Sequence, residues 1–358
     1  MKKNGKKIDR KKIKSISIIS PFHNESKNLE ILYKKLINVS FKLLDNNLLD
    51  FIEIILIDDG STDDSLNIIL DSIKTYNPLD YPEFQNKYNN INNAEKIKLI
   101  LIKLKQNLGQ SYALSTGFQI AQGDIIITID SDLQNDPFDI IKLFENIKKQ
   151  DVEVISGYRI NRNEGFRVIA SLIGNKLIKL VSNYNIQDVG CSLKAYNQKT
   201  IKNLKLPYGY HRFLPIIAFV NKEKISNIEV NFSPRIFGKS HYGYSRVIWL
   251  LLRLLTLYIL KGYNSKQIKT KLFLISLITL ILLPLVLFTL FNKSFIVLNF
   301  IALFILVYNL FTIEEVYKFL KFQKEDILKN SEFVLNLNLN EIIVKNLKNT
   351  KTSELITK

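Results

Sequence analysis

From Ser15 onward, short runs of β-branched residues alternate with longer amphipathic stretches, and this alternation limits the folds open to the chain. The short runs predict strands, and the longer stretches predict helices because their apolar residues recur at helical spacing. Strands that are apolar throughout and separated by helices indicate a mainly parallel sheet covered on both faces, an α/β fold. The predicted strands are 16–20, 51–57, 99–104, 125–129 and 152–156, and the predicted helices are 25–44, 63–73, 112–121 and 137–149. The polar, Asn-rich stretch 76–96 is predicted to be a surface insertion.

Polar residues gather where three of the predicted strands end. The sequence PFHNE follows the first strand at 21–25, DDGSTD follows the second at 58–63, and DSDLQ follows the fourth at 130–134. Any one of these clusters could simply shape a turn and cap the next helix. Open α/β sheets, however, bind ligands outside the carboxyl ends of their strands. Three clusters at corresponding strand ends therefore predict a ligand site at that edge of the sheet.

Asp130 and Asp132 are the most specific part of this pattern. Two aspartates one residue apart after an apolar strand can present oxygen ligands to a hard divalent ion, Mg²⁺ or Mn²⁺. Such an ion usually keeps several waters and bridges phosphate oxygens, so we predict a nucleotide diphosphate as ligand. One cysteine and three scattered histidines do not make a zinc site.

Several motifs, taken together, point to a known family. From Ser15 to about Tyr244 the chain resembles a family 2 glycosyltransferase with the GT-A fold. Within that family it is similar to the polyprenyl-phosphate glycosyltransferases, which include dolichol-phosphate mannose synthases and bacterial undecaprenyl-phosphate sugar transferases. The resemblance covers about two thirds of the chain and rests on PFHNE at 21–25, DDGSTD at 58–63, DSDLQ at 130–134, GYR at 157–159, DVGCSLKAY at 188–196, HRF at 211–213 and RIFGKSHYG at 235–243.

On the donor side, the resemblance implies a role for each matching position. Asp130 and Asp132 would bind the metal and the diphosphate, and Gln134 would lie close to the transferred sugar. The remaining donor contacts, to base, ribose and sugar, would come from Pro21, Phe22, Glu25, Asp59 and Ser131. A uridine nucleotide is the preferred donor by resemblance alone, and a guanosine nucleotide stays open.

On the acceptor side, Arg159 stands where the family contacts phosphate, and Asp188 matches the acidic residue assigned to the acceptor or to the general base. Arg212 either touches substrate phosphate or packs at the edge of the domain. Three further residues would lie over the active site near the lipid phosphate, because they match the motif R-x-x-G-x-S-x-Y-G: Arg235, Ser240 and Tyr242.

The chemistry of a phosphate acceptor bears on Asp188. A phosphate monoester has its second pKa at about 6, so it is largely dianionic near neutral pH and does not demand a strong base. Asp188 is therefore either a positioning residue or a modest base. A single displacement at the anomeric carbon inverts the configuration, and we predict an inverting enzyme.

The formal charge of +17 is concentrated in two stretches. Residues 1–14 carry eight Lys or Arg against one Asp, and residues 235–271 carry eight with no acid. The rest of the chain is nearly neutral, which speaks against a nucleic-acid-binding surface. The hydrophobic content of 47% excludes an intrinsically disordered chain, and the single cysteine excludes a disulfide framework. We interpret residues 1–14 either as a basic tail that contacts the membrane or as an ordinary solvated terminus, and 15–245 as the GT-A domain.

The composition becomes strongly apolar beyond residue 246. The segment 246–271 is predicted to lie at the membrane surface, because its apolar run is short and interrupted by Arg253; the alternative is a buried core helix. The stretch 272–313 is predicted to form a transmembrane hairpin, with spans at 272–291 and 295–313 that each have the length a bilayer requires. Lysines flank both ends of the hairpin, which favours a multi-pass protein with both termini cytoplasmic, including a tail at 314–358.

Together these features predict a metal-dependent, membrane-bound glycosyltransferase that moves a sugar from a nucleotide donor to polyprenyl phosphate at the cytoplasmic leaflet. One alternative is a family 2 glycosyltransferase acting on a hydroxyl acceptor in cell-surface glycan synthesis. Another is a membrane-tethered binding protein without activity. The sequence does not decide whether the chain forms a homo-oligomer.

Overall fold

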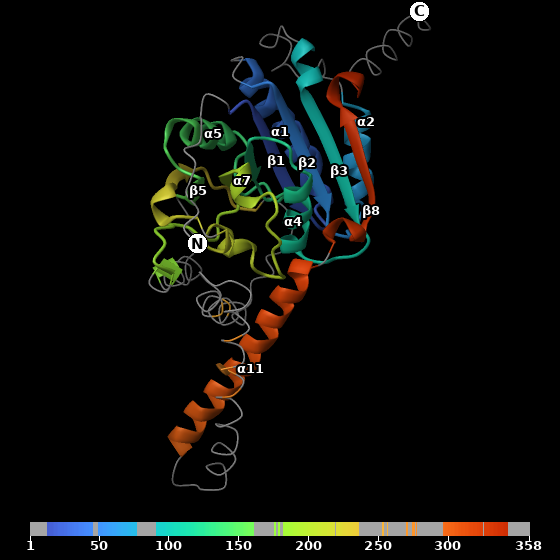
Figure 1. The fold of residues 1–358 in the computed structure, drawn as a ribbon. Helices are drawn as coiled ribbons and strands as arrows, with labels where there is room; N and C mark the ends of the chain where they lie inside the picture. The colour runs from blue at the N-terminus through green and yellow to red at the C-terminus, as the bar shows by residue number, and fades with distance from the viewer. Residues whose placement is uncertain are drawn as a thin grey trace, which may run out of the picture.

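The computed structural model describes residues 13–45, 49–76, 91–160, 175–176, 178–179, 182–218, 220–235, 253, 256, 270, 274–275, 277, 296–324 and 326–342. Within these residues eight strands form one sheet in the order β7-β5-β6-β4-β1-β2-β3-β8 (Figure 1). The strands are β1 (Ser15–Phe22), β2 (Phe51–Asp58), β3 (Ile97–Leu104), β4 (Ile125–Thr128), β5 (Val154–Arg159), β6 (Lys194–Asn197), β7 (Ile225–Val230) and β8 (Ser331–Asn338).

The middle of the sheet is parallel. β1 pairs with β2 on one side and with β4 on the other, and β3 continues beyond β2 in the same direction. All eight residues of β1 are buried, and those that are not apolar are three small serines, as expected for a central strand covered on both faces. β6 and β8 run antiparallel to their neighbours, while β5 and β7 are parallel to each other. The predicted α/β class and mainly parallel sheet are therefore confirmed. The first and last residues of each predicted strand differ by at most three positions from those of an observed strand.

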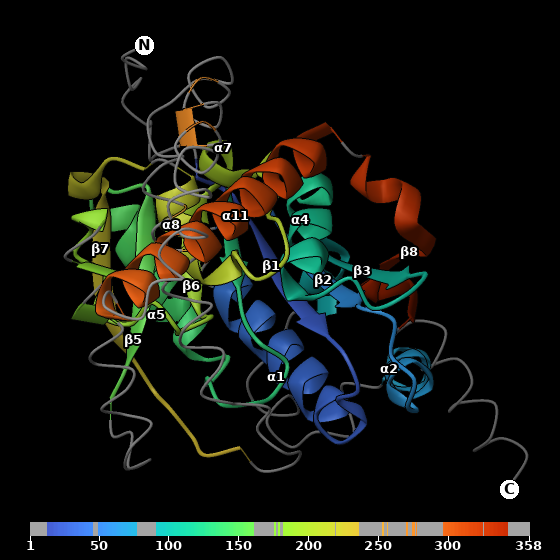
Figure 2. The same ribbon diagram turned by 90° about the horizontal axis from the view of Figure 1, so that it is seen from below.

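Helices cover both faces of the sheet, and each face has its own apolar core. α1, α2 and α5 pack against one face, whereas α4 and the chain between β5 and β7 pack against the other (Figure 2). The helices are α1 (Ser26–Asp45), α2 (Ser65–Lys74), η3 (Ile91–Lys96), α4 (Gln110–Ile120), α5 (Asp139–Lys149), α7 (Gln198–Ile201), η4 (His211–Phe213), α8 (Leu214–Ile217), η5 (Lys222–Lys224), α11 (Ile296–Lys324) and η7 (Ile327–Asn330).

The C-terminal part of the chain differs from the sequence prediction. α11 projects away from the sheet at one end, and β8 returns to pair with β3 at the edge of the sheet (Figure 1). Residues 331–338, which the sequence analysis placed in a tail from 314, therefore belong to the sheet, whereas the predicted domain boundary at 245 lies outside the described residues. The alternating sequence SEFVLNLN turns Phe333, Leu335 and Leu337 toward the core. About a hundred residues separate β8 from β7 in the sequence, so no local signal shows that this strand belongs to the sheet.

Several predictions fall mainly outside the described residues. This holds for the tail 1–14 except its last two residues, and for most of 246–271 and of the first predicted span, 272–291. The second predicted span, 295–313, lies within α11 from residue 296 onward. In the part of the chain that the structure describes, none of the helices combines the length and the apolar character needed to cross a membrane. The hairpin stays a prediction.

Candidate functional site

An open groove runs along the carboxyl edge of β1, β2 and β4. The β1–α1 and β2–α2 loops are joined there through Asn24, whose side-chain oxygen accepts hydrogen bonds from the backbone N–H groups of Thr62 and Asp63. The groove brings together eight of the predicted site residues. Its lining consists of Pro21, Phe22, His23, Glu25, Asp59, Asn107, Gly109, Gln110, Asp130, Ser131, Asp132 and Arg235.

Asp59 lies at one end of the groove and is held by the loop between β3 and α4. Its Oδ1 atom accepts hydrogen bonds from the backbone N–H groups of Leu108, at 2.8 Å, and Gly109, at 3.1 Å. Gly109 has a φ of +89°, a conformation that favours glycine, and this geometry directs its N–H toward the carboxylate. Burial raises the pKa of Asp59 to about 6, although the two hydrogen bonds oppose that shift.

Asp130 and Asp132 follow β4 and lie in the same groove. The side-chain amide of Gln110 donates to Oδ1 of Asp130 at 2.6 Å, and Arg235 forms an ion pair with Oδ2 of Asp132 at 2.7 Å. Burial, followed by the negative charge of Asp132, raises the pKa of Asp130 to about 6. Asp132 therefore lies close enough to Asp130 for its negative charge to disfavour the ionised form of Asp130.

These two carboxylates fit a hard divalent cation. A cation between them would relieve their mutual repulsion, and carboxylate oxygens are the donors that Mg²⁺ and Mn²⁺ prefer. The described residues contain no cluster of three or more His, Cys, Asp or Glu that could hold a metal. Mg²⁺ commonly uses one or two carboxylates together with substrate phosphates, so the pair suits an ion that arrives with a diphosphate.

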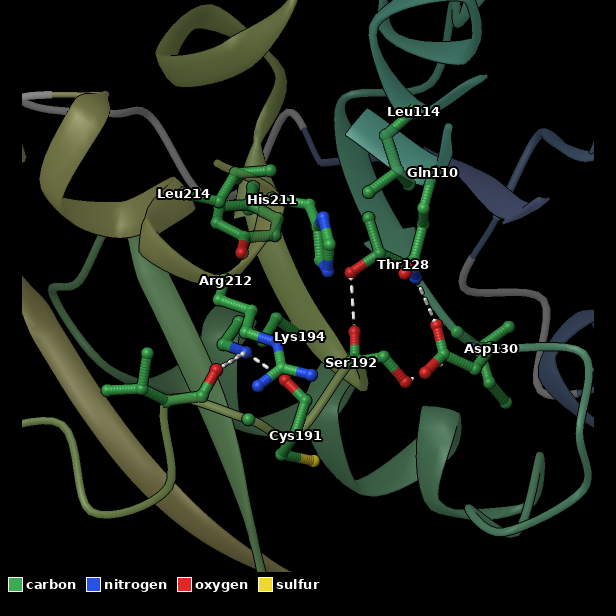
Figure 3. Close-up of a pocket in the computed structure, with 14 residues that line it drawn as sticks. Gln110, Leu114, Thr128, Asp130, Cys191, Ser192, Lys194, His211, Arg212 and Leu214 are labelled. Atoms are coloured by element: carbon green, nitrogen blue, oxygen red, sulfur yellow. Dashed lines mark hydrogen bonds between the residues drawn. The ribbon is translucent and has the colours of Figure 1, made fainter. Parts of the chain in front are cut away.

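A second, more enclosed pocket adjoins the groove and shares Gln110 and Asp130 with it. Figure 3 shows Lys194 and Arg212 on one side of this pocket and Asp130 on the other. Its lining consists of Gln110, Leu114, Thr128, Ile129, Asp130, Val189, Gly190, Cys191, Ser192, Lys194, Tyr196, His211, Arg212 and Leu214. Arg212, which sequence reasoning left undecided, thus faces a pocket next to the predicted metal ligands.

Lys194 is a residue of this pocket that sequence reasoning did not single out. It begins β6, is only 3% exposed, and its ammonium donates to the backbone carbonyls of Val189 and Cys191. Burial lowers its pKa. No ion pair between Lys194 and a carboxylate occurs among the residues that the structure describes. Lys194 belongs to the motif DVGCSLKAY, which the sequence analysis did single out, but a lysine within a strand does not by itself indicate burial.

His211 lies beside the cations of the pocket. Burial, together with the charges of Arg212, Lys194 and Arg253, lowers the pKa of His211 to about 3. The ring is therefore neutral near physiological pH, and its Nδ1 atom is 3.1 Å from the hydroxyl of Ser111.

Asp188 and Arg159 form a two-point ion pair beside the enclosed pocket. Nε of Arg159 lies 2.7 Å from Oδ2 of Asp188, and Nη2 lies 3.0 Å from Oδ1. The backbone N–H of Gly190 also donates to Oδ1 at 3.1 Å. The guanidinium lies over the ring of Phe232, with 5.5 Å between its carbon and the ring centroid. Both carboxylate oxygens of Asp188 thus accept hydrogen bonds from within the protein, which suits a structural or positioning part.

Among the residues that the structure describes, three further predicted ones line neither hollow: Gln134, Arg159 and Asp188. Gln134 lines neither the groove nor the pocket, and its backbone is held between Asp132 and Ser233. Ser240 and Tyr242 lie outside the described residues.

Comparisons with known proteins identify the family of this chain. The model of the family described as glycosyl transferase family 2 matches residues 17–205. A dodecaprenyl-phosphate galacturonate synthase from Rhizobium johnstonii is 34% identical over 218 residues, which are 60% of this chain and 59% of that protein. An undecaprenyl-phosphate 4-deoxy-4-formamido-L-arabinose transferase from Aeromonas hydrophila is 32% identical over 245 residues, 68% of either chain. The alignment with the Rhizobium protein thus leaves about two fifths of that relative uncovered.

A solved structure with similar architecture is glucosyl-3-phosphoglycerate synthase from Mycobacterium tuberculosis, in complex with Mn²⁺, uridine diphosphate and glucosyl-3-phosphoglycerate. The TM-score is 0.49 at 18% sequence identity, and the match covers 72% of this chain and 83% of that one.

Proposed function

Because this chain belongs to glycosyltransferase family 2, we propose that it transfers a sugar from a nucleotide donor to a polyprenyl phosphate. The observation that carries the proposal is the pair of hollows that meet at Asp130. One hollow is rich in carboxylates and suits a metal-bound diphosphate. The other contains the buried ammonium of Lys194 and suits a phosphate group. The names of the Rhizobium and Aeromonas relatives, both transferases that use a polyprenyl phosphate, support the same acceptor class.

In the groove, Asp130 and Asp132 would hold Mg²⁺ or Mn²⁺ together with the donor diphosphate. When bound, the ion supplies a positive charge that stabilises the departing nucleotide. Glu25, Asp59 and the residues Pro21, Phe22 and Ser131 would contact the base, ribose and sugar. A uridine nucleotide is the preferred donor. Gln134 would have to approach the sugar from outside the groove lining, because its side chain does not line the groove.

In the enclosed pocket, Lys194 and Arg212 would bind the phosphate of the lipid acceptor. That phosphate is largely dianionic near neutral pH, since its second pKa is about 6, so it can attack without first losing a proton to the protein. Asp188 would then act by holding Arg159 and the turn at Gly190 in place. A single displacement with these groups inverts the anomeric configuration.

A polyprenyl acceptor resides in a bilayer, so we also propose that the chain is attached to the membrane. The apolar spans 272–291 and 295–313 would form the hairpin, and 246–271 would lie at the surface near the acceptor phosphate. Arg235, Ser240 and Tyr242 would close over the site from that side. Both termini and the catalytic domain would then be cytoplasmic.

The test is a transfer assay with the full chain in detergent or liposomes. Labelled UDP- and GDP-sugars are supplied in turn with undecaprenyl phosphate and with Mg²⁺ or Mn²⁺. We expect a labelled lipid product with at least one donor, lost when the divalent ion is chelated. A folded protein that gives no lipid product with any donor contradicts the proposal.

Replacing Asp188 with Asn separates a phosphate acceptor from a hydroxyl acceptor. A sugar hydroxyl must lose its proton to a general base, which typically contributes about 10²–10⁴-fold to the rate, whereas a phosphate dianion need not. We expect Asp188→Asn to slow transfer to polyprenyl phosphate about tenfold, through a weakened ion pair with Arg159, and without changing the shape of the pH–rate profile. The loss of the acidic limb from that profile, where the rate rises as the base loses its proton, would instead identify Asp188 as the base.

A further inference from the structure

Residues 326–338, which follow α11, fold back onto the sheet and hold the loop between β3 and α4 at both of its ends. We call residues 326–338 the C-terminal segment and residues 106–111 the donor loop. At the start of the donor loop, the backbone N–H of Lys105 donates to the carbonyl of Asn330 at 2.9 Å, and the ammonium of Lys105 donates to the carbonyl of Lys329 at 3.1 Å.

At the end of the donor loop, the contact is made by Tyr112. Its hydroxyl donates to the carbonyl of Ile327 at 2.9 Å and accepts from the side-chain amide of Asn330 at 2.7 Å. Tyr112 is 5% exposed and Ile327 is fully buried, so water does not readily replace these bonds. The ring of Phe322, at the end of α11, packs against Tyr112 with 5.4 Å between centroids.

The donor loop carries the contacts that fix both acidic ends of the groove. Leu108 and Gly109 donate to Asp59, and Gln110 donates to Asp130. Only six residues, 106–111, lie between Lys105 and Tyr112, so a loop anchored at these two residues has little freedom to move the donors. The match to the family model ends at residue 205, and the C-terminal segment lies beyond it.

We propose that the C-terminal segment is a positioning element for the donor loop, and that Tyr112 transmits its effect to the nucleotide site. A loop already held in its binding conformation does not have to be ordered by the ligand, and this increases affinity. Because the segment follows directly on α11, the same bonds connect α11 to the donor groove. The inference rests on the proposed function in taking this groove as the nucleotide site.

The test replaces Tyr112 with Phe, which keeps the buried ring and removes both hydrogen bonds. Binding of UDP in the presence of Mn²⁺ is measured by calorimetry with the full chain. Since one hydrogen bond contributes modestly to a free energy, we expect the Kd for UDP to rise about three- to tenfold. Steady-state kinetics should show a higher KM for the nucleotide sugar and an unchanged KM for polyprenyl phosphate. Without any ligand, the amides of Leu108 and Gly109 should exchange with solvent faster than in the unmodified protein.

Two further variants make the result specific. Tyr184→Phe is a matched control, because Tyr184 is 4% exposed and donates to the carbonyl of Val220 at 2.7 Å, in a different part of the molecule. It should lose comparable thermal stability and keep its affinity for UDP. Asn330→Ala removes one of the two hydrogen-bond partners of the Tyr112 hydroxyl, so combining it with Tyr112→Phe should weaken UDP binding no more than Tyr112→Phe alone.

The possible outcomes are distinct. If Tyr112→Phe leaves both the Kd for UDP and the amide exchange unchanged, or if Tyr184→Phe weakens UDP binding equally, the positioning role is wrong. If the unmodified protein binds neither UDP nor GDP with Mn²⁺, the proposed function fails instead. The ligand-free amide exchange of Leu108 and Gly109 then still decides whether the C-terminal segment positions the loop.

Discussion

The open groove and the enclosed pocket share Gln110 and Asp130, yet their walls carry opposite charges. The groove gathers Glu25, Asp59, Asp130 and Asp132 around one cation, Arg235. The pocket places the buried ammonium of Lys194 and the guanidinium of Arg212 opposite a single carboxylate. Neighbouring hollows of one site are thus lined by side chains of opposite charge.

The difference shows how one edge of a sheet can accept two anionic substrates. Because Glu25, Asp59, Asp130 and Asp132 all line the groove, it repels a bare diphosphate, and a cation would be needed to bind one. The pocket needs no such ion, because its positive charge comes from the protein. A transfer between a nucleotide diphosphate and a lipid phosphate needs both kinds of anion site, side by side.

The largest effect is expected from removing a carboxylate of the groove. Asp130→Asn keeps the shape of the side chain but loses a ligand for the divalent ion, so kcat/KM should fall by about a thousandfold. Thermal stability near neutral pH should be unchanged or higher, because the raised pKa of Asp130 shows that its ionised form is disfavoured by the fold. Transfer assays and thermal unfolding measure the two quantities.

Asp136→Asn is the matched control for that substitution. Asp136 accepts from the backbone N–H of Phe138 near the start of α5 and lines neither hollow, so its loss should affect stability more than rate. Equal activity of Asp130→Asn and the unmodified protein would show that the groove takes no part in the reaction.

A smaller effect is expected when the pocket loses its buried cation. Lys194→Met should raise the KM for polyprenyl phosphate about 10- to 100-fold, since hydrogen bonds to charged groups are the stronger ones. The KM for the nucleotide sugar should change little. Lys199→Met removes an exposed lysine five residues along the chain and should leave both values unaltered. If Lys194→Met instead raised only the KM for the nucleotide sugar, the pocket would be shown to bind the donor rather than the acceptor.

The smallest effect concerns the pH dependence of stability and of metal binding, which comes from the carboxylates of the groove. The folded protein binds protons at Asp59 and Asp130 more tightly than the unfolded chain does. Their contribution to stability is therefore full below a pH near 3.8 and is lost as the pH rises through about 6. Because the divalent ion needs ionised Asp130, its affinity should fall by up to about tenfold for each pH unit below 6.

Calorimetric titration of Mn²⁺ across this pH range, with the nucleotide present, measures that dependence. Asp130→Asn should bind the ion weakly with a flatter pH dependence. A metal affinity that is constant from about pH 5 to 8 would show that the ion binds elsewhere.

Much of the fold and the groove follows from local patterns. The helices and strands from β1 to β5 were predictable because each carries its own periodicity. Asp59, Asp130 and Asp132 could be placed at one edge because parallel strands bring their carboxyl ends together. The residues of the enclosed pocket were harder to find, since Gln110, Lys194 and His211 come from separate segments and become neighbours only on folding.

The sequence by itself determined the α/β class, the order of the central elements and the acidic strand ends, since these depend on residues close together in the chain. The tertiary structure alone decided that Lys194 is buried and that Arg159 forms an ion pair with Asp188. It alone also decided that β8 returns to the sheet and that η7, just before β8, holds Tyr112. Each of these depends on contacts between distant residues. Which distant segments meet is set by the packing of the whole domain, and no short window of sequence contains that information.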